Sequence, residues 1–227
     1  MRPGLARPSM VTLSFSHTVQ QPNGRPSMAK RVLSPTQLDN EFFKERVNRT
    51  QTFLGECIAT QHSSQIKLRQ STVGIAGAGG IGGAIALRLC RLGVGALKIA
   101  DPDVFEISNI NRQIGASYDN IGKNKASTVG QMAFDIAKDT RIEVYEDGIS
   151  HKNAAEFVAG CDLVLDQLDF SVIDEKFALH DAFHESEVTH TILACSVIGW
   201  SAHLYKFTRQ SMHIRKWYDP VDHSNIV

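Results

Sequence analysis

A cluster of glycines restricts the possible folds of this chain more than any other feature. Five glycines fall within residues 77–83. They follow a short apolar segment, Thr72–Ala76, and open a helical pattern, Ile81–Leu92, that ends at Gly93. Glycines in such a turn let the backbone approach a phosphate, and the free N–H groups of the following helix attract negative charge. The sequence therefore predicts a strand–turn–helix unit that binds a nucleotide.

Two acidic residues follow the next predicted strand. Asp101 comes directly after Ala96–Ala100, about 20 residues beyond the glycines, where a carboxylate accepts hydrogen bonds from ribose hydroxyls. Asp103 lies in the same loop. The glycines and Asp101 fit an NAD-dependent dehydrogenase as well as any other nucleotide-binding protein of this fold.

Predicted strands and helices alternate through most of the chain. Beyond those already named, we expect strands over Arg141–Glu146, Leu163–Leu165 and Thr189–Cys195, and helices over Asn124–Lys138, Asn153–Val158 and Ser171–Glu187. This order predicts a Rossmann-like, mostly parallel sheet with helices on both faces. Polar–apolar alternation over Ser201–Phe207 indicates an antiparallel strand at the C-terminal edge.

The two ends of the chain differ from its middle. Residues 1–38 are rich in Arg, Ser and Pro and contain no acid, which is typical of a disordered tail or an organelle-targeting segment. We expect one α/β domain over residues 39–210, beginning with helices over Gln37–Asn48 and Phe53–Ala59. Residues 211–227 are expected to form a C-terminal extension, with truncation as one explanation of the short end.

Composition narrows the protein class. Hydrophobic residues make up 42% of the chain and the formal net charge is zero, so no bulk field favours nucleic acid or an anionic membrane. No segment of about 20 strongly apolar residues is present to span a membrane. The four cysteines form no CxxC pair, which indicates reduced thiols and no structural zinc. We therefore expect a cytoplasmic protein.

A polar and cationic loop distinguishes between the possible nucleotides. Asn111, Arg112 and Lys125 add amide and cationic groups beyond the ribose position. Arg binds phosphate oxygens through two parallel hydrogen bonds, and Lys supplies a point charge. Such groups suit a triphosphate whose α-phosphorus is attacked, because they neutralise the charge that shifts onto the departing pyrophosphate. The loop thus favours ATP over a dinucleotide.

The combined motifs resemble the ThiF/MoeB/HesA superfamily of ubiquitin-activating-like adenylyltransferases. The matching motifs are GAGGIGG, D-x-D-x-x-x-x-S-N-I-N-R-Q, G-K-N-K and D-L-V-L-D-x-x-D, and the resemblance covers roughly residues 46–207. It implies adenylation of the C-terminal carboxylate of a ubiquitin-like or sulfur-carrier protein, with ATP and Mg²⁺.

The resemblance also implies residue roles. Arg112, Lys125 and Asp169 would carry the catalysis, with Asp169 also holding Mg²⁺. Arg49, from the sequence Arg46-Val47-Asn48-Arg49, would reach the ATP of the partner subunit in a homodimer. The remaining residues expected to contact the nucleotide are Gly77, Gly79, Gly80, Gly82, Asp101, Asp103, Asn109 and Asn111.

Some features depart from the family pattern. Phe170 stands where the family often has Asn, and the CxxC pairs of many members are missing. Some members form a thioester on a cysteine, but Cys195 lies in an apolar strand and is expected to be inert.

Three alternatives stay open at this stage. One is a protein like the tRNA threonylcarbamoyladenosine dehydratases, which activate a carboxylate on tRNA; only this alternative calls for an RNA partner. The others are an NAD-dependent oxidoreductase and a non-catalytic partner subunit.

Two further groups of residues have a possible role. His180 and His184 are four residues apart on one predicted helix face, a spacing that suits zinc, but without a third ligand they are expected to form a polar face. Asp166 is expected to hydrogen-bond the glycine turn or to assist the metal.

Overall fold

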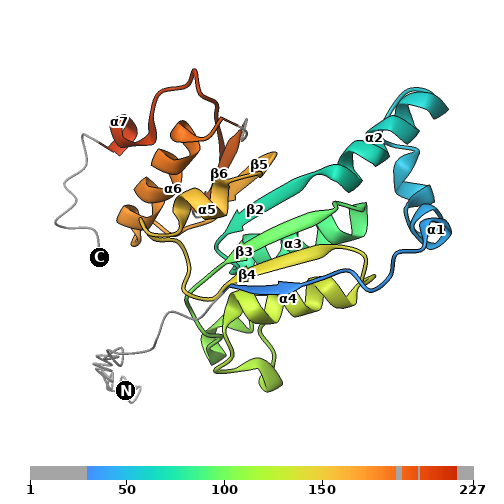
Figure 1. The fold of residues 1–227 in the computed structure, drawn as a ribbon. Helices are drawn as coiled ribbons and strands as arrows, with labels where there is room; N and C mark the ends of the chain where they lie inside the picture. The colour runs from blue at the N-terminus through green and yellow to red at the C-terminus, as the bar shows by residue number, and fades with distance from the viewer. Residues whose placement is uncertain (1–29, 188–190, 199, 219–227) are drawn as a thin grey trace, which may run out of the picture.

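A seven-stranded sheet forms the centre of the computed structural model, which describes residues 30–187, 191–198 and 200–218 (Figure 1). The strand order is β1-β4-β3-β2-β5-β6-β7. The strands are β1 (Arg31–Leu33), β2 (Thr72–Ala76), β3 (Ala96–Ala100), β4 (Arg141–Tyr145), β5 (Leu163–Asp166), β6 (Ile192–Ile198) and β7 (Ser201–Phe207). The helices are α1 (Asn40–Gln51), α2 (Ile58–Gln70), α3 (Gly80–Leu92), α4 (Lys125–Asp135), α5 (Ala154–Val158), α6 (Ile173–Glu185) and α7 (Ile214–Tyr218).

The five central strands run parallel, which confirms the predicted fold class. β2 pairs with β3 on one side and with β5 on the other. The chain order therefore reverses at β2, and ligands of such sheets bind in the crevice outside the carboxyl ends of the strands at this point. The glycine turn at residues 77–83 follows β2 directly and lies at this crevice.

Helices pack on both faces of the sheet, as expected. Successive residues of β2 point to opposite faces. Ile75 belongs to the core shared with Leu87 and Val129 of α3 and α4, whereas Ala76 belongs to the core shared with Phe157 and Leu179 of α5 and α6. Each face thus has its own apolar layer, and the two layers hold the carboxyl ends of the strands in place.

Both edges of the sheet are antiparallel. β7 pairs with β6, which confirms the predicted C-terminal edge strand. The opposite edge strand, β1, was not predicted, because its three residues carry no apolar pattern. Backbone pairing with β4 holds it, and Arg31 donates to Ser127 and Gln131 of α4 at 3.3 and 2.9 Å. Part of the segment expected to be a tail therefore belongs to the sheet.

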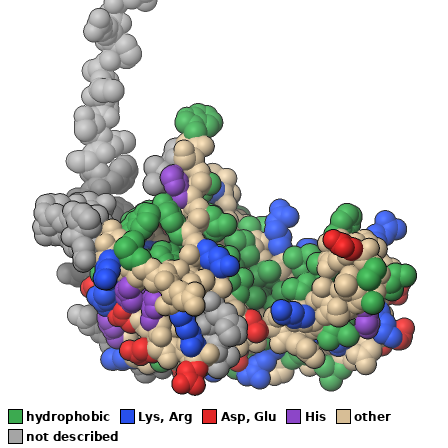
Figure 2. All heavy atoms as spheres, turned by 90° about the horizontal axis from the view of Figure 1, so that it is seen from above, with side chains coloured by type: hydrophobic (Ala, Val, Ile, Leu, Met, Phe, Trp, Pro, Cys, Tyr) green, Lys and Arg blue, Asp and Glu red, His purple; other side chains and the backbone are tan. Residues whose placement is uncertain are grey.

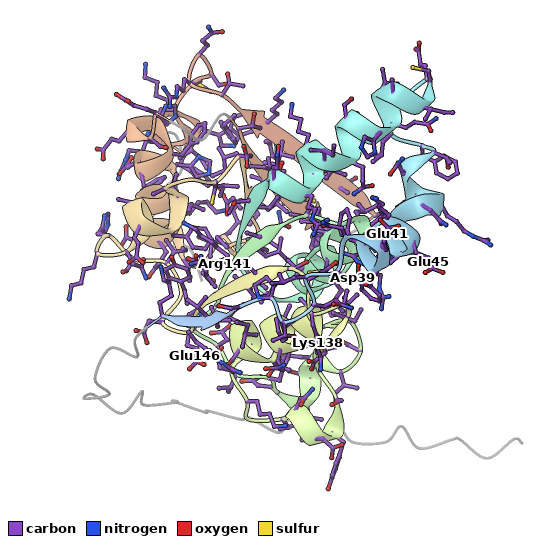
Figure 3. All side chains as sticks on the ribbon, turned by 45° about the vertical axis from the view of Figure 1, so that its right-hand side comes forward. Asp39, Glu41, Glu45, Lys138, Arg141 and Glu146 are labelled. Atoms are coloured by element: carbon purple, nitrogen blue, oxygen red, sulfur yellow. The ribbon has the colours of Figure 1, made fainter. Side chains whose placement is uncertain are left out.

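The first helix begins later than predicted because its cap is Asp39. The carboxylate of Asp39 accepts a hydrogen bond of 2.8 Å from the backbone N–H of Glu41. In Figure 3, Asp39, Glu41 and Glu45 lie along α1. Acidic groups in the first turn of a helix stabilise its positive end.

The second helix was predicted in the wrong place. The predicted range is Phe53–Ala59, but α2 runs over Ile58–Gln70 and extends away from the sheet (Figure 1). Its sequence is polar, and Gln65 is its one buried residue. The Gln65 amide donates to the carbonyl oxygen of Leu92 at 2.9 Å. A polar helix held by such a contact gives no hydrophobic period to find.

The C-terminal part packs against α6. The short helix α7 buries Ile214 and Tyr218, although no period was apparent in this part of the sequence. β6 begins at Ile192, and residues 189 and 190 of the predicted strand lie outside the described residues. Among the helices that the structure describes, none is long and apolar enough to cross a membrane.

Candidate functional site

The glycine turn is held tightly against the end of β5. Gly77 has a φ of +99°, which favours glycine, and a Cβ at this position would lie 2.5 Å from the carbonyl oxygen of Gln167. A Cβ on Gly82 would collide with the carbonyl oxygen of Gly77. Gly79 caps α3, and Gly80 is its first residue. The turn therefore requires glycine at positions 77 and 82, and it presents the N-terminus of α3 at the crevice.

Asp101 connects the glycine turn to the loop after β3. One of its carboxylate oxygens accepts from the backbone N–H of Ala78 at 2.7 Å and the other from that of Asp103 at 3.0 Å. Burial raises the pKa of Asp101, and these hydrogen bonds and Lys125 partly offset that effect. Each carboxylate oxygen can accept a second hydrogen bond, so the geometry still allows the predicted contact with ribose.

Lys125 joins the same network from the start of α4. Its ammonium lies 3.0 Å from a carboxylate oxygen of Asp103, and its backbone N–H donates to the carbonyl oxygen of Asp103 at 2.8 Å. Lys125 is buried, but the Asp103 side chain is largely exposed. A pair with one partner in water is weak, so the ammonium can turn towards a bound anion at little cost.

The loop with Asn109, Asn111 and Arg112 lies over the glycine turn. A Cβ on Gly80 would lie 3.6 Å from the carbonyl oxygen of Arg112, so the two segments are in contact. The exposed Arg112 guanidinium donates through Nη1 to the carbonyl oxygen of Ser108 and to the Asn111 amide oxygen, at 3.2 and 3.1 Å. A guanidinium has five N–H donors, so the Arg112 side chain keeps further donors for phosphate oxygens.

Asn109 has a structural task within this loop. Its amide oxygen accepts from the backbone N–H of Glu106 at 3.1 Å, and the side chain is buried. It thereby holds the single helical turn Ile107–Asn109 that carries Asn111 and Arg112. The predicted contact between Asn109 and the nucleotide stays a prediction.

Two glutamines at the glycine turn were missed in the sequence. Gln113 is 8% exposed, and its amide nitrogen lies 3.7 Å from the place of a Cβ on Gly79. The amide oxygens of Gln113 and Gln167 are both buried without a hydrogen-bond partner. A buried unpaired amide costs free energy, so both are candidates to bind the ligand. In the sequence, the position of Gln113 next to Arg112 is the one signal that could have identified it as a site residue.

Asp169 is exposed in the loop after β5. One of its carboxylate oxygens accepts from the backbone N–H of Phe170 at 2.6 Å. Mg²⁺ usually binds through one or two carboxylates together with substrate phosphates and water. No cluster of three or more His, Cys, Asp or Glu side chains suited to a metal occurs among the described residues. Asp169 therefore fits Mg²⁺ that arrives with a nucleotide, and not a site made by protein groups alone.

The structure corrects one of the two roles predicted for Asp166, the hydrogen bond to the glycine turn, and the role of assisting a metal stays a prediction. The Asp166 carboxylate does not bond the glycine turn; both oxygens lie 2.8 Å from the ammonium of Lys176, and one lies 3.0 Å from Nε2 of His180. It also accepts from the backbone N–H of Leu168 at 3.1 Å. Asp166 therefore fixes the start of the loop that carries Asp169. Lys176 and His180 are four residues apart on α6, a spacing that the sequence offered.

His180 and His184 have separate surroundings. His180 is buried against Asp166, whereas His184 stacks on His213 with ring centroids 4.4 Å apart. Desolvation lowers the pKa of His184 and His213, and each charge would repel the other. The two rings therefore have different partners, Asp166 for His180 and His213 for His184.

Arg49 lies far from the glycine turn of its own chain. The neighbouring Arg46 pairs with Asp139 at 2.7 Å and donates to the carbonyl oxygens of Cys90 and Arg91, in the last turn of α3. The 13 residues of α3 span about 20 Å from that end to the glycine turn. Arg46 thus has a structural role, and Arg49, three residues on, is exposed at the far end of α3.

The cysteines are all free thiols. Cys90 and Cys161 are buried, and desolvation raises the pKa of each to about 11. Cys195 is partly buried in β6, and Cys57 is exposed at the start of α2.

Comparison with known proteins identifies the fold and its relatives. Residues 55–224 match the model of the ThiF family. An adenylyltransferase and sulfurtransferase, UBA4, from Candida albicans is 30% identical over 180 residues, which are 78% of this chain and 39% of that protein. A SAMP-activating enzyme E1 from Haloferax volcanii is 36% identical over 105 residues, 46% of this chain and 39% of that protein. The chain thus spans about two fifths of the length of these relatives.

A solved structure with a bound nucleotide is also similar. It is the E. coli tRNA N6-threonylcarbamoyladenosine dehydratase TcdA in complex with ATP. The TM-score is 0.59 with 26% identity, and the match covers 66% of this chain and 58% of that chain.

Proposed function

The chain belongs to the ThiF family, and from that premise we propose that it binds ATP and adenylates a carboxylate. One observation carries the proposal. Hydrogen bonds link the glycine turn through Asp101 and Asp103 to Lys125, and the backbone of Arg112 contacts the same turn. Two cations are thereby held at the place where the fold binds phosphates.

These groups support displacement at the α-phosphorus of ATP. An oxygen of the acceptor carboxylate forms the new bond to this phosphorus. The bond to the bridging oxygen breaks, and its electrons leave with pyrophosphate. The carboxylate is already ionised, so no general base is needed. Arg112 and Lys125 stabilise the charge on the phosphates, and the rigid turn positions the nucleotide.

Asp169 would hold Mg²⁺ together with the phosphates. A bound Mg²⁺ would neutralise phosphate charge as a Lewis acid. The link between Asp166 and the N–H of Leu168 keeps the backbone of this loop in place.

We propose the C-terminus of a ubiquitin-like or sulfur-carrier protein as the acceptor. The support comes from the names of the relatives, an adenylyltransferase and sulfurtransferase and a SAMP-activating enzyme. Both are much longer than the matched region, so a sulfur-transfer step is outside the proposal.

The test is exchange of radiolabelled pyrophosphate into ATP, with candidate carriers ending in Gly-Gly, alongside calorimetric titration with ATP and with NAD. We expect ATP binding and carrier-dependent exchange. If the protein binds NAD but not ATP and catalyses no exchange, the oxidoreductase alternative replaces this proposal.

The similarity to TcdA favours a second acceptor, a carboxylate on tRNA. The zero net charge of the chain offers no general attraction for RNA. Exchange that depends on tRNA carrying threonylcarbamoyladenosine, and on no carrier protein, would select this acceptor.

We further propose that the chain works as a homodimer in which Arg49 reaches the ATP of the partner. Arg46, three residues before Arg49, contacts the far end of α3, which is about 20 Å from the glycine turn of the same chain. Exposed apolar side chains occur on the α1–α2 segment, including Phe53 and Ile58, and on the β6–β7 hairpin, including Val197 and Leu204. Figure 2 shows hydrophobic side chains in the hollow on one face of the molecule. Such exposure is typical of a surface that binds another protein.

Sedimentation velocity tests the dimer. We expect wild-type protein to sediment as a dimer and the variant Phe53→Glu/Ile58→Glu as a monomer. Met212→Glu, which places a negative charge at another exposed position, should stay dimeric. A wild-type monomer at micromolar concentration would contradict this proposal.

A further inference from the structure

A cavity of about 60 Å³ lies beside the predicted ATP site, between α6, α7 and the β6–β7 hairpin. Leu168 and Phe170, the two neighbours of Asp169, both line it, but Asp169 does not. Successive Cα atoms are about 3.8 Å apart. The cavity therefore begins one residue away from the carboxylate assigned to the metal and the phosphates.

Five of the residues that line the cavity are aromatic. Tyr205 and Trp217 line it and pack edge to face with ring centroids 5.0 Å apart. Trp217 and Phe170 are each nearly half exposed, at 46% and 44%. The exposure of these two lining side chains indicates that the cavity opens to solvent, and Phe170 is the chain neighbour of Asp169.

The charge of the cavity excludes an ionic occupant. Lys176 also lines it, but both oxygens of Asp166 lie 2.8 Å from its ammonium, so the pair is neutral. The described residues that line the cavity include no acidic side chain. Neither an anion nor a cation would find a free counter-charge there, and burying an unpaired charge is costly.

The size of the cavity suits one aliphatic side chain. One water-sized probe occupies roughly 10–15 Å³ on this measure, so the space holds about four to six such groups. A Leu or Met side chain has about four heavy atoms beyond Cα, whereas an indole is larger. The apolar part of the lining, which includes Leu168, Phe170 and Ile214, favours these side chains over polar ones of the same size.

We propose that this cavity is a specificity pocket for the acceptor. It takes one aliphatic side chain of the acceptor, from a residue a few positions before the carboxylate that is adenylated. This inference rests on the proposed function, which supplies the acceptor carboxylate. It adds that a residue shortly before this carboxylate has an aliphatic side chain.

The first test uses short Ser-rich peptides that end in Gly-Gly. One peptide has no Leu, and the others carry a single Leu at the third, fourth or fifth position from the end. We expect Leu at one of these positions to raise kcat/KM for pyrophosphate exchange about tenfold or more, since a pocket for an aliphatic group discriminates to that degree. Equal values for all peptides would overturn the inference.

Two variants locate the effect. Ser196→Leu fills the cavity from β6, and Ala202→Leu adds the same side chain at an exposed position of β7 outside it. We expect Ser196→Leu to abolish the preference for the Leu peptide and Ala202→Leu to keep it, with ATP affinity unchanged in both. A preference that survives in a folded Ser196→Leu protein would also overturn the inference.

A binding measurement separates this inference from the proposed function. The chain has two tryptophans, so Trp200→Phe leaves Trp217 at the cavity as the single reporter. Saturable change of its fluorescence with the Leu peptide, absent with the Ser peptide and in Ser196→Leu, supports the pocket even if no exchange occurs. If the two peptides change the fluorescence equally, the pocket is refuted, whatever the result of the exchange assay.

Discussion

Lys176 places its ammonium 2.8 Å from both carboxylate oxygens of Asp166, and the two side chains are 6% and 0% exposed. The pair links α6 to the end of β5. Since Asp166 also accepts from the N–H of Leu168, the pair holds the backbone that leads to Asp169. A buried ion pair therefore supports the loop that carries Asp169.

We predict that Lys176→Met destabilises the protein by about 3–5 kcal/mol, because it leaves the Asp166 carboxylate buried without its main counter-charge. The double variant Asp166→Asn/Lys176→Met should recover part of this loss. Lys152→Met, at an exposed lysine, should change the stability by no more than about 0.5 kcal/mol. Urea unfolding followed by circular dichroism measures all three. A Lys176→Met protein as stable as wild type would show that the pair contributes little.

The same pair predicts how stability depends on pH. Burial alone would raise the pKa of Asp166, but the hydrogen bond from His180 and the charge of Lys176 outweigh it, so this pKa lies below its usual value. A carboxylate with a lowered pKa stabilises the fold above its unfolded pKa of about 3.9 and loses that contribution as pH falls through the folded value. We expect the free energy of unfolding to decrease below about pH 4, and less steeply in Asp166→Asn. Identical pH profiles for the two proteins would contradict this assignment.

At the glycine turn, Gly77→Ala is predicted to be much more harmful than Gly160→Ala. Both glycines have positive φ, at +99° and +72°, so each substitution costs about 1–2 kcal/mol in backbone strain. A Cβ at Gly77 would also press on the backbone of Gln167, whereas nothing lies within 4 Å at Gly160. We expect Gly77→Ala to weaken ATP binding roughly tenfold to a hundredfold by displacing the turn. Calorimetric titration of both variants with ATP provides the measurement, and equal affinities would exclude the contact as a determinant.

Arg112→Ala is predicted to slow pyrophosphate exchange by roughly 10²–10³-fold while leaving the fold intact, because it removes stabilisation of charge on the phosphates. Arg112→Lys should fall between this variant and wild type, since Lys keeps the charge but loses the paired hydrogen bonds. The control is Arg91→Ala, an exposed arginine at the far end of α3. If exchange persists at the wild-type rate in Arg112→Ala, this residue has no part in the chemistry.

The fold around the site could be predicted because its signals are local. A strand, a glycine turn and a helix in sequence specify the unit that contains Gly77, and strict alternation identified β7. The failures have a common cause in contacts between distant residues. β1 forms only because β4 offers a free edge, and α2 is polar and held by Gln65 at the end of α3.

The candidate site was predicted only as a set of residue types. Asp101 and Lys125 are linked through Asp103, and the hydrogen bond that the backbone N–H of Ala78 donates to Asp101 depends on the register of β2 and β3. The partners of Asp166 could not be assigned, because Lys176 and His180 reach it only after α6 packs on β5. Pairing across elements is set by packing, which a single sequence does not display.

The distance of Arg49 from its own glycine turn predicts complementation between inactive variants. In a homodimer with shared sites, Arg49→Ala and Arg112→Ala should each lose pyrophosphate exchange. A mixed dimer contains one site with both substitutions and one site with neither. Random reassortment of equal amounts makes half the dimers mixed, so about a quarter of wild-type activity should return.

The mixture is prepared by dilution below the dissociation constant and reconcentration, and exchange is measured before and after. The control is a mixture of Arg112→Ala and Lys125→Ala. Each of these two variants should be inactive by itself. In each site, Arg112 and Lys125 come from the same chain. A mixed dimer of these two variants therefore has no site free of substitution and should stay inactive. Recovery in the control, or none with Arg49→Ala, would mean that each site is built from one chain alone.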